Sequence, residues 1–448
     1  SVVWGRQCYR WSDLDFEANK TDGHGIDWPI RYKDLAPWYS HVEKFVGVSG
    51  EKLNLPQLPD GEFLPPMDLS IAEKHFKNAV KSKFNGRVVT IGRTANLTEP
   101  LESQNRGKCM YRSQCDRGCS YGAYFSTLSS TLPAATNTGN LTTKADTIVS
   151  SLDFDNKKKK ITGINAIDIK SKKLYKIKSR VVFLCASTVA SIQILFNSKS
   201  HSMPNGLGNN YDILGRYLMD HTFGTGATGI LPFYDEYIEY GRRPTGMYIP
   251  RFRNLKNDQN KHEFVRGYNF QSWGQGRASP QNIKGFGEKL KNNLRIPGPW
   301  RLPLHAFCEI LPRKSNRILI DDNKVDQYGI PQVKFEFEWS ENEINMLNDA
   351  TEQAELMLKA AGCTSIEKRS VQSAPGTGIH EMGGARMGND PTKSIVNRYN
   401  QAHFADNLFI TDGSAMTSAS SVNPSITYMA MTARAANYAS DQIKRNKI

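Results

Sequence analysis

The sequence lacks several features that would assign it to a specialised class of protein. No apolar run approaches the roughly 18 residues that a membrane-spanning helix needs, and no internal repeat or low-complexity stretch is present. The composition is that of an ordinary globular protein, with 39% hydrophobic and 23% charged residues over 448 positions. We therefore expect a soluble protein of roughly two or three domains, without a transmembrane segment.

The patterns of nucleic-acid-binding proteins are missing as well, although the chain is basic. Its formal net charge is +14 and its pI is about 9.3, which attracts acidic partners or anionic surfaces. No zinc finger, aromatic RNA-binding signature or basic helix accompanies this charge. The densest basic run, Lys157 to Lys160, lies between two strand-like segments and is typical of a solvated hairpin turn. We expect no nucleic-acid partner.

A disulfide scaffold is excluded by the cysteines, which number only seven in this long chain. Three of them, Cys109, Cys115 and Cys119, lie close together in the sequence, but their spacing fits no common zinc site. This cluster predicts a tight loop or a local disulfide rather than a metal site.

The clearest α/β signal lies in the middle of the first half. The segments with strand-like patterns are 141–149, 161–169, 172–178 and 181–185. The last of these is short and wholly apolar, as expected of a strand buried in a parallel sheet. It ends in Ala186-Ser187, and the spacing predicts a helix over 188–196. This strand, turn and helix form one unit of a doubly wound sheet, whose helix N-terminus can face a phosphate or a ring carbonyl.

Two further helices show a periodic apolar face. One is predicted over 70–84, and a longer one over 341–361 follows predicted strands at 317–320 and 333–337. The core face of the longer helix consists of Ile344, Leu347, Ala350, Ala354 and Leu358. The two predicted strands and the longer helix indicate a separate sheet with a covering helix between about residues 218 and 374.

The residues best suited to chemistry are in the last 75 or so positions. His380 is followed by Gly383, Gly384 and Gly388, and glycines allow close backbone approach to a ligand. Histidine has a pKa near neutrality, which suits a base that takes the proton of an alcohol. A lone histidine is most often structural, so this hypothesis depends on what accompanies it.

What accompanies it is the pair Asn423-Pro424, directly before a long helical segment that extends to about Ile443. The pair predicts an asparagine N-cap with proline at the first helical position. A helix N-terminus carries about half a positive charge, which would stabilise the anion of a reduced flavin ring. Asn423 could then hold a substrate oxygen by a hydrogen bond.

These segments, in this order, resemble the C-terminal part of the glucose–methanol–choline (GMC) oxidoreductases, flavoenzymes that oxidise alcohols. The resemblance implies FAD as cofactor, His380 as the base that faces the flavin, and Asn423 as its partner that orients the substrate. It also implies cofactor contacts in three places: Ile148 or Val149 beside the adenine, Ala186 and Ser187 after the apolar strand, and Asp412, Gly413, Asn423, Pro424 and Ser425 beside the flavin.

Within that family, three N-terminal segments resemble the branch of bacterial sugar dehydrogenases, which includes glucoside 3-dehydrogenases and gluconate dehydrogenases. They are Trp4-Gly5-Arg6-Gln7, Trp28-Pro29-Ile30 and the segment Cys115 to Gly122. The resemblance implies hydride transfer from a CH–OH group of a sugar or sugar derivative to flavin N5. It also implies a cytochrome or quinone as electron acceptor and a small accessory subunit as a possible partner.

Candidate substrate contacts come from the aromatic middle region, where a role in the core or on the surface is the alternative for each residue. Rings that could stack on a sugar are Tyr268, Phe270, Trp273 and Trp300, and side chains that could bind its hydroxyls are Gln271, Arg277 and Arg301.

The phosphate-binding G-x-G-x-x-G loop of this family, which should follow the first strand, has no counterpart here. The literal match, Gly224 to Gly229, follows no apolar strand and precedes Pro232, so we interpret it as a chance match. We expect an α/β (α+β two-domain) fold with an incomplete Rossmann-like FAD-binding domain at 1–217, lacking its N-terminal βαβ unit. A substrate-binding domain at 218–374, with an antiparallel or mixed sheet covered by helices, and a return to the flavin domain at 375–448 complete the prediction.

The alternative hypothesis is a non-catalytic fragment, or one piece of a split flavoprotein that needs a separate nucleotide-binding part. The sequence predicts neither a periplasmic nor a cytoplasmic location in a bacterium, since any export signal would precede Ser1.

Overall fold

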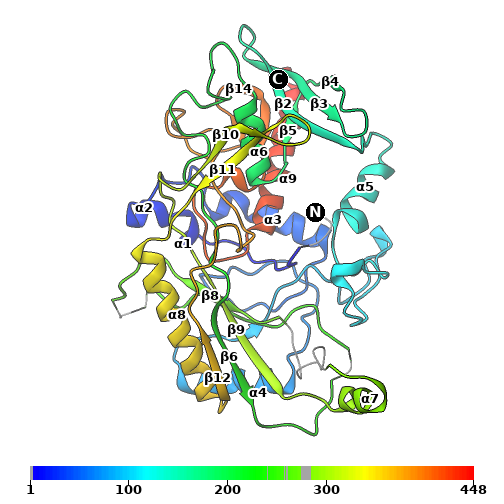
Figure 1. Ribbon diagram of the computed structural model, residues 1–448, viewed down its shortest axis with the longest axis vertical. Helices are drawn as coiled ribbons and strands as arrows, with labels where there is room; N and C mark the ends of the chain where they lie inside the picture. Colours follow the sequence, from blue (N-terminus) through cyan, green and yellow to red (C-terminus); the bar gives the residue numbers. More distant parts are fainter. Residues whose placement is uncertain (1–3, 240, 257, 259–260, 274–283) are drawn as a thin grey trace.

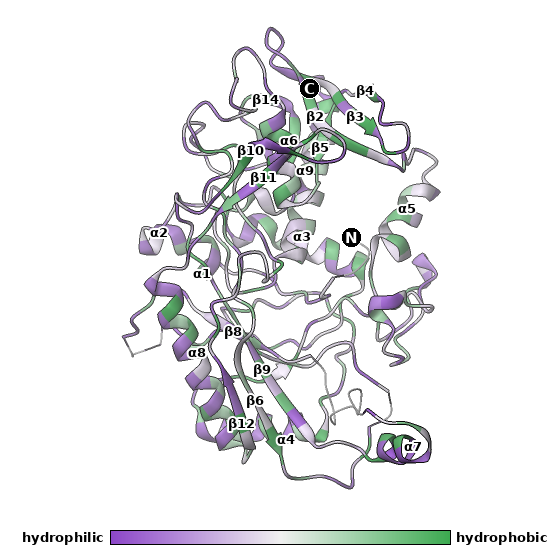
Figure 2. Cartoon of the chain, viewed as in Figure 1, coloured by the Kyte–Doolittle hydropathy of each residue, from purple (hydrophilic) through white to green (hydrophobic). Residues whose placement is uncertain are grey.

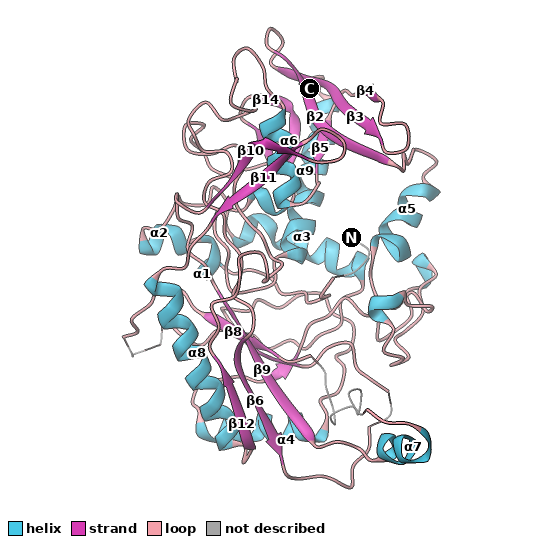
Figure 3. Ribbon diagram, viewed as in Figure 1, coloured by secondary structure: helices cyan, strands magenta, loops and turns pink. Residues whose placement is uncertain are grey.

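The structure is a computed structural model that describes residues 4–239, 241–256, 258, 261–273 and 284–448. It has an upper part with short sheets and two packed helices, and a lower part built on one larger sheet (Figure 1). Long irregular segments join the two (Figure 3). The helices are α1 (Asp13–Phe16), α2 (Ala18–Asp22), α3 (Tyr32–Val46), α4 (Ile71–Lys83), α5 (Leu132–Asn137), α6 (Thr188–Asn197), α7 (Gly287–Arg295), α8 (Glu341–Ala360) and α9 (Ser425–Lys444).

The strands fall into four sheets. The six-stranded sheet has the order β1-β7-β8-β9-β6-β12, and the smaller sheets are β13-β14-β5, β2-β3-β4 and β10-β11. Their bounds are β1 (Thr90–Ile91), β2 (Thr147–Asp155), β3 (Lys160–Asp168), β4 (Leu174–Lys178), β5 (Val182–Leu184), β6 (Thr225–Leu231), β7 (Met247–Ile249), β8 (Tyr268–Gln271), β9 (Trp300–Cys308), β10 (Arg317–Val325), β11 (Pro331–Glu336), β12 (Thr364–Arg369), β13 (Gln401–Ala402) and β14 (Ala405–Ile410).

The predicted strand–turn–helix unit is present in the upper part. β5 pairs in parallel with β14, and α6 follows it directly. Val182 and Leu184 of β5 are buried, whereas Phe183 is exposed and stacks on Phe409 of the neighbouring strand. The parallel pairing places the ends of two strands, and therefore the turns that follow them, at one edge of the sheet.

A three-stranded antiparallel meander, β2-β3-β4, packs beside this unit. It contains the predicted hairpin, and the run of lysines lies at its first turn. The first strand was predicted too early: residues 141–146 are exposed and irregular, and Asp146 has a left-handed φ of 53° that precludes extended backbone at that position.

The six-stranded sheet of the lower part is covered by α8, with α4 packed beside that helix. The predicted core positions Leu347, Ala350, Ala354 and Leu358 are fully buried, and α8 carries hydrophilic turns on its outer side (Figure 2). Ile344 is only half-buried, and Met346 takes its place in the core. The antiparallel sheet with a covering helix is therefore confirmed, but the predicted strands at 317–320 and 333–337 are not part of it and form the separate pair β10-β11.

The segment from Gly224 to Gly229 enters β6 of this sheet. Gly226 has a φ of 131°, and a Cβ at this position would lie 1.9 Å from the carbonyl oxygen of Leu304 on β9. This glycine is required by the pairing of two strands, which supports the interpretation of the motif as a chance match.

The division of the chain into parts at residues 217 and 374 stays a prediction. The lower sheet takes β1, and its core takes α4, from before residue 217. The hairpin β10-β11 forms a sheet of its own and contacts α6 in the upper part.

The seven cysteines all have free thiols, so the predicted local disulfide does not form. Residues 115–117 make one turn of 3-10 helix in the predicted tight loop. Among the described helices, none is long and apolar enough to cross a membrane.

The side chain of Asn407 on β14 joins the meander to the parallel strands. Its Oδ1 accepts from the backbone N–H of Ile161 at 2.9 Å, and its Nδ2 donates to the carbonyls of Ile161 and Arg180 at 2.7 and 2.9 Å. The side chain is 2% exposed. An alanine here would leave the buried N–H and carbonyl of Ile161 on β3 and the part-buried carbonyl of Arg180 before β5 without these partners.

We predict that Asn407→Ala lowers the free energy of unfolding by about 2–4 kcal/mol, because unsatisfied buried polar groups cost roughly 1–3 kcal/mol each. Denaturant unfolding followed by tryptophan fluorescence measures this. Asn140→Ala is the matched control, because Asn140 is exposed and its substitution is expected to cost less than about 0.5 kcal/mol. Equal costs for the two variants would contradict the role given to Asn407.

Candidate active site

The turn after β14 is built around Asp412, which is half-buried. Its Oδ1 accepts from the backbone N–H of Ser414 at 3.0 Å and from its hydroxyl at 2.6 Å, and its Oδ2 accepts from the hydroxyl of Ser191 on α6. Asp412 thus fixes the end of β14 against the helix that follows β5. The turns predicted to contact the cofactor are held together by this one carboxylate.

A cavity of about 710 Å³ opens at this edge of the sheet. It lies where β5, β14 and the start of α9 meet the N-terminal helix α3. The polar residues at its wall include Cys185, Thr411, Asp412, Ser425 and Tyr428, and the apolar ones include Trp4, Phe45, Phe125 and Met429. Such a mixture suits a flat, largely apolar ring system that carries polar edges.

The other predicted cofactor residues lie beside this cavity or on the meander. Ala186 and Ser187 follow Cys185, and Gly413 and Pro424 adjoin Asp412 and Ser425. Ser187 has a φ of 77° and a ψ of 161°, a strained backbone for a residue with a side chain, found mostly at functional sites.

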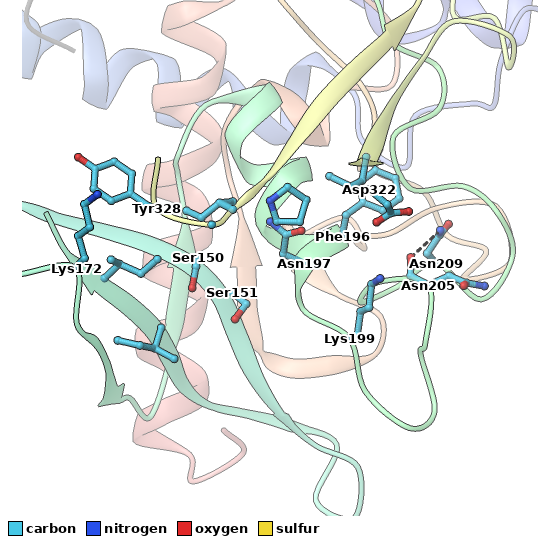
Figure 4. A pocket seen from close by; sticks show the side chains of 16 residues that line it. Ser150, Ser151, Lys172, Phe196, Asn197, Lys199, Asn205, Asn209, Asp322 and Tyr328 are labelled. Atoms are coloured by element: carbon cyan, nitrogen blue, oxygen red, sulfur yellow. Dashed lines mark hydrogen bonds between the residues drawn. The ribbon is translucent and has the colours of Figure 1, made fainter. Parts of the chain in front are cut away.

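Ile148 and Val149 are half-buried on β2. The next two residues of the strand, Ser150 and Ser151, line a second cavity of about 670 Å³ between the meander, α6 and the hairpin β10-β11 (Figure 4). The adenine contact predicted for Ile148 or Val149 stays a prediction.

His380 and Asn423, 43 residues apart in the sequence, face each other. The Nδ2 of Asn423 lies 3.3 Å from the Nε2 of His380. The other ring nitrogen of His380, Nδ1, lies 2.9 Å from Nδ1 of His221, a residue without a motif of its own. Nε2 of His221 in turn lies 2.7 Å from the carbonyl oxygen of Ser420. The two histidine rings are nearly perpendicular, at 81°.

The opposite side of Asn423 is held by β8 of the lower sheet. Nε2 of Gln271 donates to Oδ1 of Asn423 at 2.5 Å and to Oδ1 of Asn269 at 3.2 Å. Nδ2 of Asn269 donates to the carbonyl of Ser421. Asn269, Gln271 and Asn423 are at most 6% exposed, so this amide chain is a fixed part of the interior.

The side chain of Asn423 does not cap α9, the role that the sequence predicted for it. α9 begins at Ser425, and Pro424 occupies the N-cap position without a side-chain capping bond. The amide of Asn423 turns toward His380 and Gln271 because both of its polar ends find buried partners there. The predicted cap was therefore wrong, although helix caps are uncertain by a residue in general.

Asp220 fixes the backbone around the two histidines. Its carboxylate accepts from the backbone N–H groups of His221, His380 and Gly378 at 2.7, 2.9 and 3.1 Å. Burial raises the pKa of Asp220 to about 7. Burial also lowers the pKa of His221 to about 4, and burial followed by the proximity of His221 lowers the pKa of His380 well below 6.5. Both imidazoles are therefore neutral near pH 7.

The predicted substrate residues divide according to the alternation of side chains along β8. Gln271 faces the histidines, whereas Tyr268 and Phe270 point into the core beneath α8. The hydroxyl of Tyr268 donates to Asp349, and Trp300 is fully buried and donates to the carbonyl of Tyr234. We therefore assign no sugar contact to these core rings.

Trp273 is half-buried beside His305, with 6.0 Å between the ring centroids. Arg301 is exposed on β9, and Arg277 lies outside the described residues.

Sequence reasoning missed Asp220 and Asn269 as parts of this constellation, and for His221 it favoured a structural role over a place near the flavin. His221 follows Asp220 directly, and the glycines after it, Gly224 to Gly229, belong to β6 and the turn before it rather than to a motif around the histidine. The usable signal was strand alternation, since a polar residue two positions before Gln271 shares its face.

Comparisons with known proteins identify the family of the chain. The sequence matches two models described as GMC oxidoreductase, over residues 1–223 and 312–432. It is 28% identical to 2-methyl-1,2-propanediol dehydrogenase of Mycolicibacterium austroafricanum, over 96% of this chain and 78% of that protein. It is 24% identical to the fructose dehydrogenase large subunit of Gluconobacter japonicus, over 99% of this chain and 80% of that protein.

Among solved structures, pyridoxine 4-oxidase from Mesorbium loti superposes with a TM-score of 0.61 at 13% identity, over 97% of this chain and 82% of that one. This likeness shows a shared fold. Because two models of one family match on both sides of the middle region and the fold agrees, the chain belongs to the GMC oxidoreductases, flavin-dependent enzymes that oxidise CH–OH groups.

Proposed function

We propose that the chain oxidises a CH–OH group of a sugar or sugar derivative, with FAD as the oxidant, His380 as the base and Asn423 as the residue that orients the hydroxyl. One observation carries this proposal. Nε2 of His380 and Nδ2 of Asn423 face each other at 3.3 Å, a long and therefore weak hydrogen bond.

A hydroxyl is the group that this pair complements. An amide N–H only donates, so the facing Nε2 of a neutral His380 accepts. A substrate hydroxyl that enters between them donates to His380 and accepts from Asn423. His380 then takes the hydroxyl proton, while Asn423 holds the oxygen and the carbon that loses hydride.

The cofactor contributes one thing, the acceptance of hydride at the flavin ring when FAD is bound. The residues that would hold it are those predicted from the sequence: Ile148, Val149, Ala186, Ser187, Asp412, Gly413, Asn423, Pro424 and Ser425. Two features at the cavity support the fit of such a group. The buried hydroxyl of Tyr428 has no hydrogen-bond partner among the described residues, and the first turn of α9 supplies positive potential.

Gly413 follows Asp412 and is closely surrounded by other groups. A Cβ at this position would lie 2.4 Å from the Thr188 hydroxyl, 2.5 Å from the Glu381 carbonyl and 2.9 Å from the Tyr428 hydroxyl. Only glycine allows these groups to surround the turn after Asp412.

The substrate class rests on the relatives and on Gln271. The relatives named above include a fructose dehydrogenase and a diol dehydrogenase, and a gluconate 2-dehydrogenase flavoprotein of Pantoea cypripedii is 22% identical over 94% of this chain. All of these names describe polyhydroxylated or diol substrates. Gln271 is the last residue of β8, and the half-buried Trp273 follows it by two positions. Both residues are proposed as substrate contacts.

Electron transfer onward is proposed to reach a cytochrome or a quinone. The fructose dehydrogenase relative is named as a large subunit, which is consistent with a small accessory subunit as partner of this chain.

We predict that His380→Ala lowers the rate of flavin reduction by sugar about 10²–10⁴-fold, the range for loss of a general base. Stopped-flow absorbance of the flavin measures the rate. His75→Ala, whose ring binds Tyr234 and Ala361 at the far side of the lower sheet, controls for the loss of a partly buried histidine. A rate for His380→Ala within twofold of the parent would refute the role.

We predict that the rate of flavin reduction rises with pH through about 7 and that the group responsible is Asp220. Below this pH the protonated carboxyl loses acceptor capacity for the three backbone N–H groups that it holds, including that of His380.

The raised pKa of Asp220 also affects stability. Between the unfolded pKa of about 3.9 and the folded pKa of about 7, the folded chain binds more protons than the unfolded chain, so its stability falls as the pH rises.

The check is the pH profile of Asp220→Asn. Its transition near pH 7 is expected to disappear, whereas the pKa of His380 lies too low to produce one there. A transition that persists unchanged in this variant would assign it to another group.

We predict that Gly413→Ala weakens FAD binding by at least about tenfold, equivalent to about 1.4 kcal/mol, because the turn must move away from Thr188 and Glu381. Titration by quenching of flavin fluorescence measures the affinity. Gly86→Ala, whose added Cβ would meet no atom within 4 Å, is expected to leave the affinity unchanged. Unaltered binding by Gly413→Ala would remove this turn from the cofactor site.

A further inference from the structure

We propose that Asp15, Ser420 and His221 are positioning residues, which hold His380 in the tautomer that carries its proton on Nδ1 and leave Nε2 free to accept the substrate proton. This inference rests on the proposed function of His380 as the base. It concerns residues that no motif identifies, one of them more than 350 positions away in the sequence.

The argument starts at the backbone carbonyl of Ser420, which only accepts hydrogen bonds. Nε2 of His221, at 2.7 Å from this oxygen, must therefore carry a proton. Since His221 is neutral, its Nδ1 has no proton and is an acceptor. Nδ1 of His380, at 2.9 Å, is then the donor of that pair. The Nε2 atom of a neutral His380 is left as an acceptor.

A second line of hydrogen bonds reaches the same atom from the other side. The carbonyl of Ser421 requires Asn269 to donate from Nδ2, so Oδ1 of Asn269 accepts from Gln271. The second N–H of Gln271 goes to Oδ1 of Asn423, which leaves Nδ2 of Asn423 to donate to Nε2 of His380. Both lines assign the same polarity to Nε2, although they begin on different carbonyls.

The position of the Ser420 carbonyl is itself fixed from the N-terminal region. Ser420 has a left-handed φ of 55°, an unfavourable conformation for serine. Its hydroxyl donates to Oδ1 of Asp15 at 2.6 Å and accepts from the backbone N–H of Val422 at 3.1 Å. Asp15 is 4% exposed, and within the described part of the chain that oxygen has no other hydrogen-bond partner, since Ser12 binds Oδ2. The Asp15 bond thus stabilises the backbone turn that aims the carbonyl at His221.

Neighbouring contacts hold the same segment against the N-terminal helices. Nε1 of Trp28 donates to the hydroxyl of Ser418 at 2.8 Å, and Nδ2 of Asn19 donates to the carbonyl of Thr417 at 2.9 Å. The segment therefore reaches the histidines as a rigid element.

The first experiment determines the tautomer directly by NMR of the full chain with ¹⁵N-labelled histidine. The chain has nine histidines, and the signals of His380 are those absent from His380→Ala. We expect an unprotonated Nε2 and a protonated Nδ1 on His380 between pH 7 and 8. A proton on Nε2 would overturn the proposal.

The second experiment replaces His221 in two ways. In His221→Gln the amide keeps one acceptor and one donor, so the tautomer of His380 is expected to persist and flavin reduction to stay within about threefold. In His221→Leu neither the acceptor nor the donor remains, so we expect part of the molecules to carry a proton on Nε2 of His380. The rate of flavin reduction is then expected to fall about tenfold or more. Equal losses in both variants, with the tautomer unchanged, would reduce His221 to a packing residue.

The third experiment separates Ser420 from its surroundings by a matched pair. Ser12→Ala removes a hydroxyl bond to the other oxygen of Asp15, whereas Ser420→Ala removes the one that supports the carbonyl. We expect a mixed tautomer of His380 and a rate lowered about threefold to tenfold in Ser420→Ala only. Identical tautomers in the two variants would exclude Asp15 and Ser420 from the positioning role.

The outcomes distinguish this inference from the proposed function. A normal rate in His380→Ala would refute the base, whatever the tautomer. A proton on Nε2 with a slow His380→Ala variant would keep the base and refute the positioning by Asp15, Ser420 and His221.

Discussion

Two adjacent backbone carbonyls, those of Ser420 and Ser421, determine how the rest of the site is arranged. A carbonyl has no proton to give, so every side chain hydrogen-bonded to it must donate. From Ser420 this requirement passes through His221, and from Ser421 it passes through Asn269 and Gln271. The two chains meet between His380 and Asn423. The direction of each hydrogen bond at the reacting atoms is thus set by the backbone.

This arrangement needs segments from the whole length of the chain. The carbonyls lie between β14 and α9, and the amides of Asn269 and Gln271 lie on β8 of the lower sheet. Asp15 comes from α1, and Trp28 comes from the segment between α2 and α3. Each segment is buried by its own part of the core, so no one of them can move without leaving polar groups unpaired. Buried networks of this kind rigidify a site when every member is satisfied. The upper and lower parts of the molecule are therefore joined through the site itself.

The sequence predicted the elements well where a pattern repeats over many residues. The βα unit of β5 and α6, the hairpin of β3 and β4, and the helices α4 and α8 follow from apolar periodicity. The strand expected at 141–149 was displaced, because a left-handed Asp146 interrupts it. His380 and Asn423 were found because glycines and a helix start surround them. The role of His221 could not be derived from the sequence, which favoured a structural histidine, since this role depends on a ring contact between residues 159 positions apart.

The low pKa of His380 has a consequence for the chemistry. His380 is desolvated and adjacent to another neutral imidazole, so it is unprotonated at pH 7, and in its proposed role as base no proton must leave before substrate binds. The same surroundings make the protonated ring unstable, and it is therefore a good donor once the hydroxyl proton has been taken. Asp220, whose Oδ1 lies 2.9 Å from the backbone nitrogen of His380, supplies a negative charge close to this residue above pH 7. A weak base beside a carboxylate that ionises near neutrality can accept a proton and release it again, which is what repeated turnover of an alcohol oxidoreductase requires.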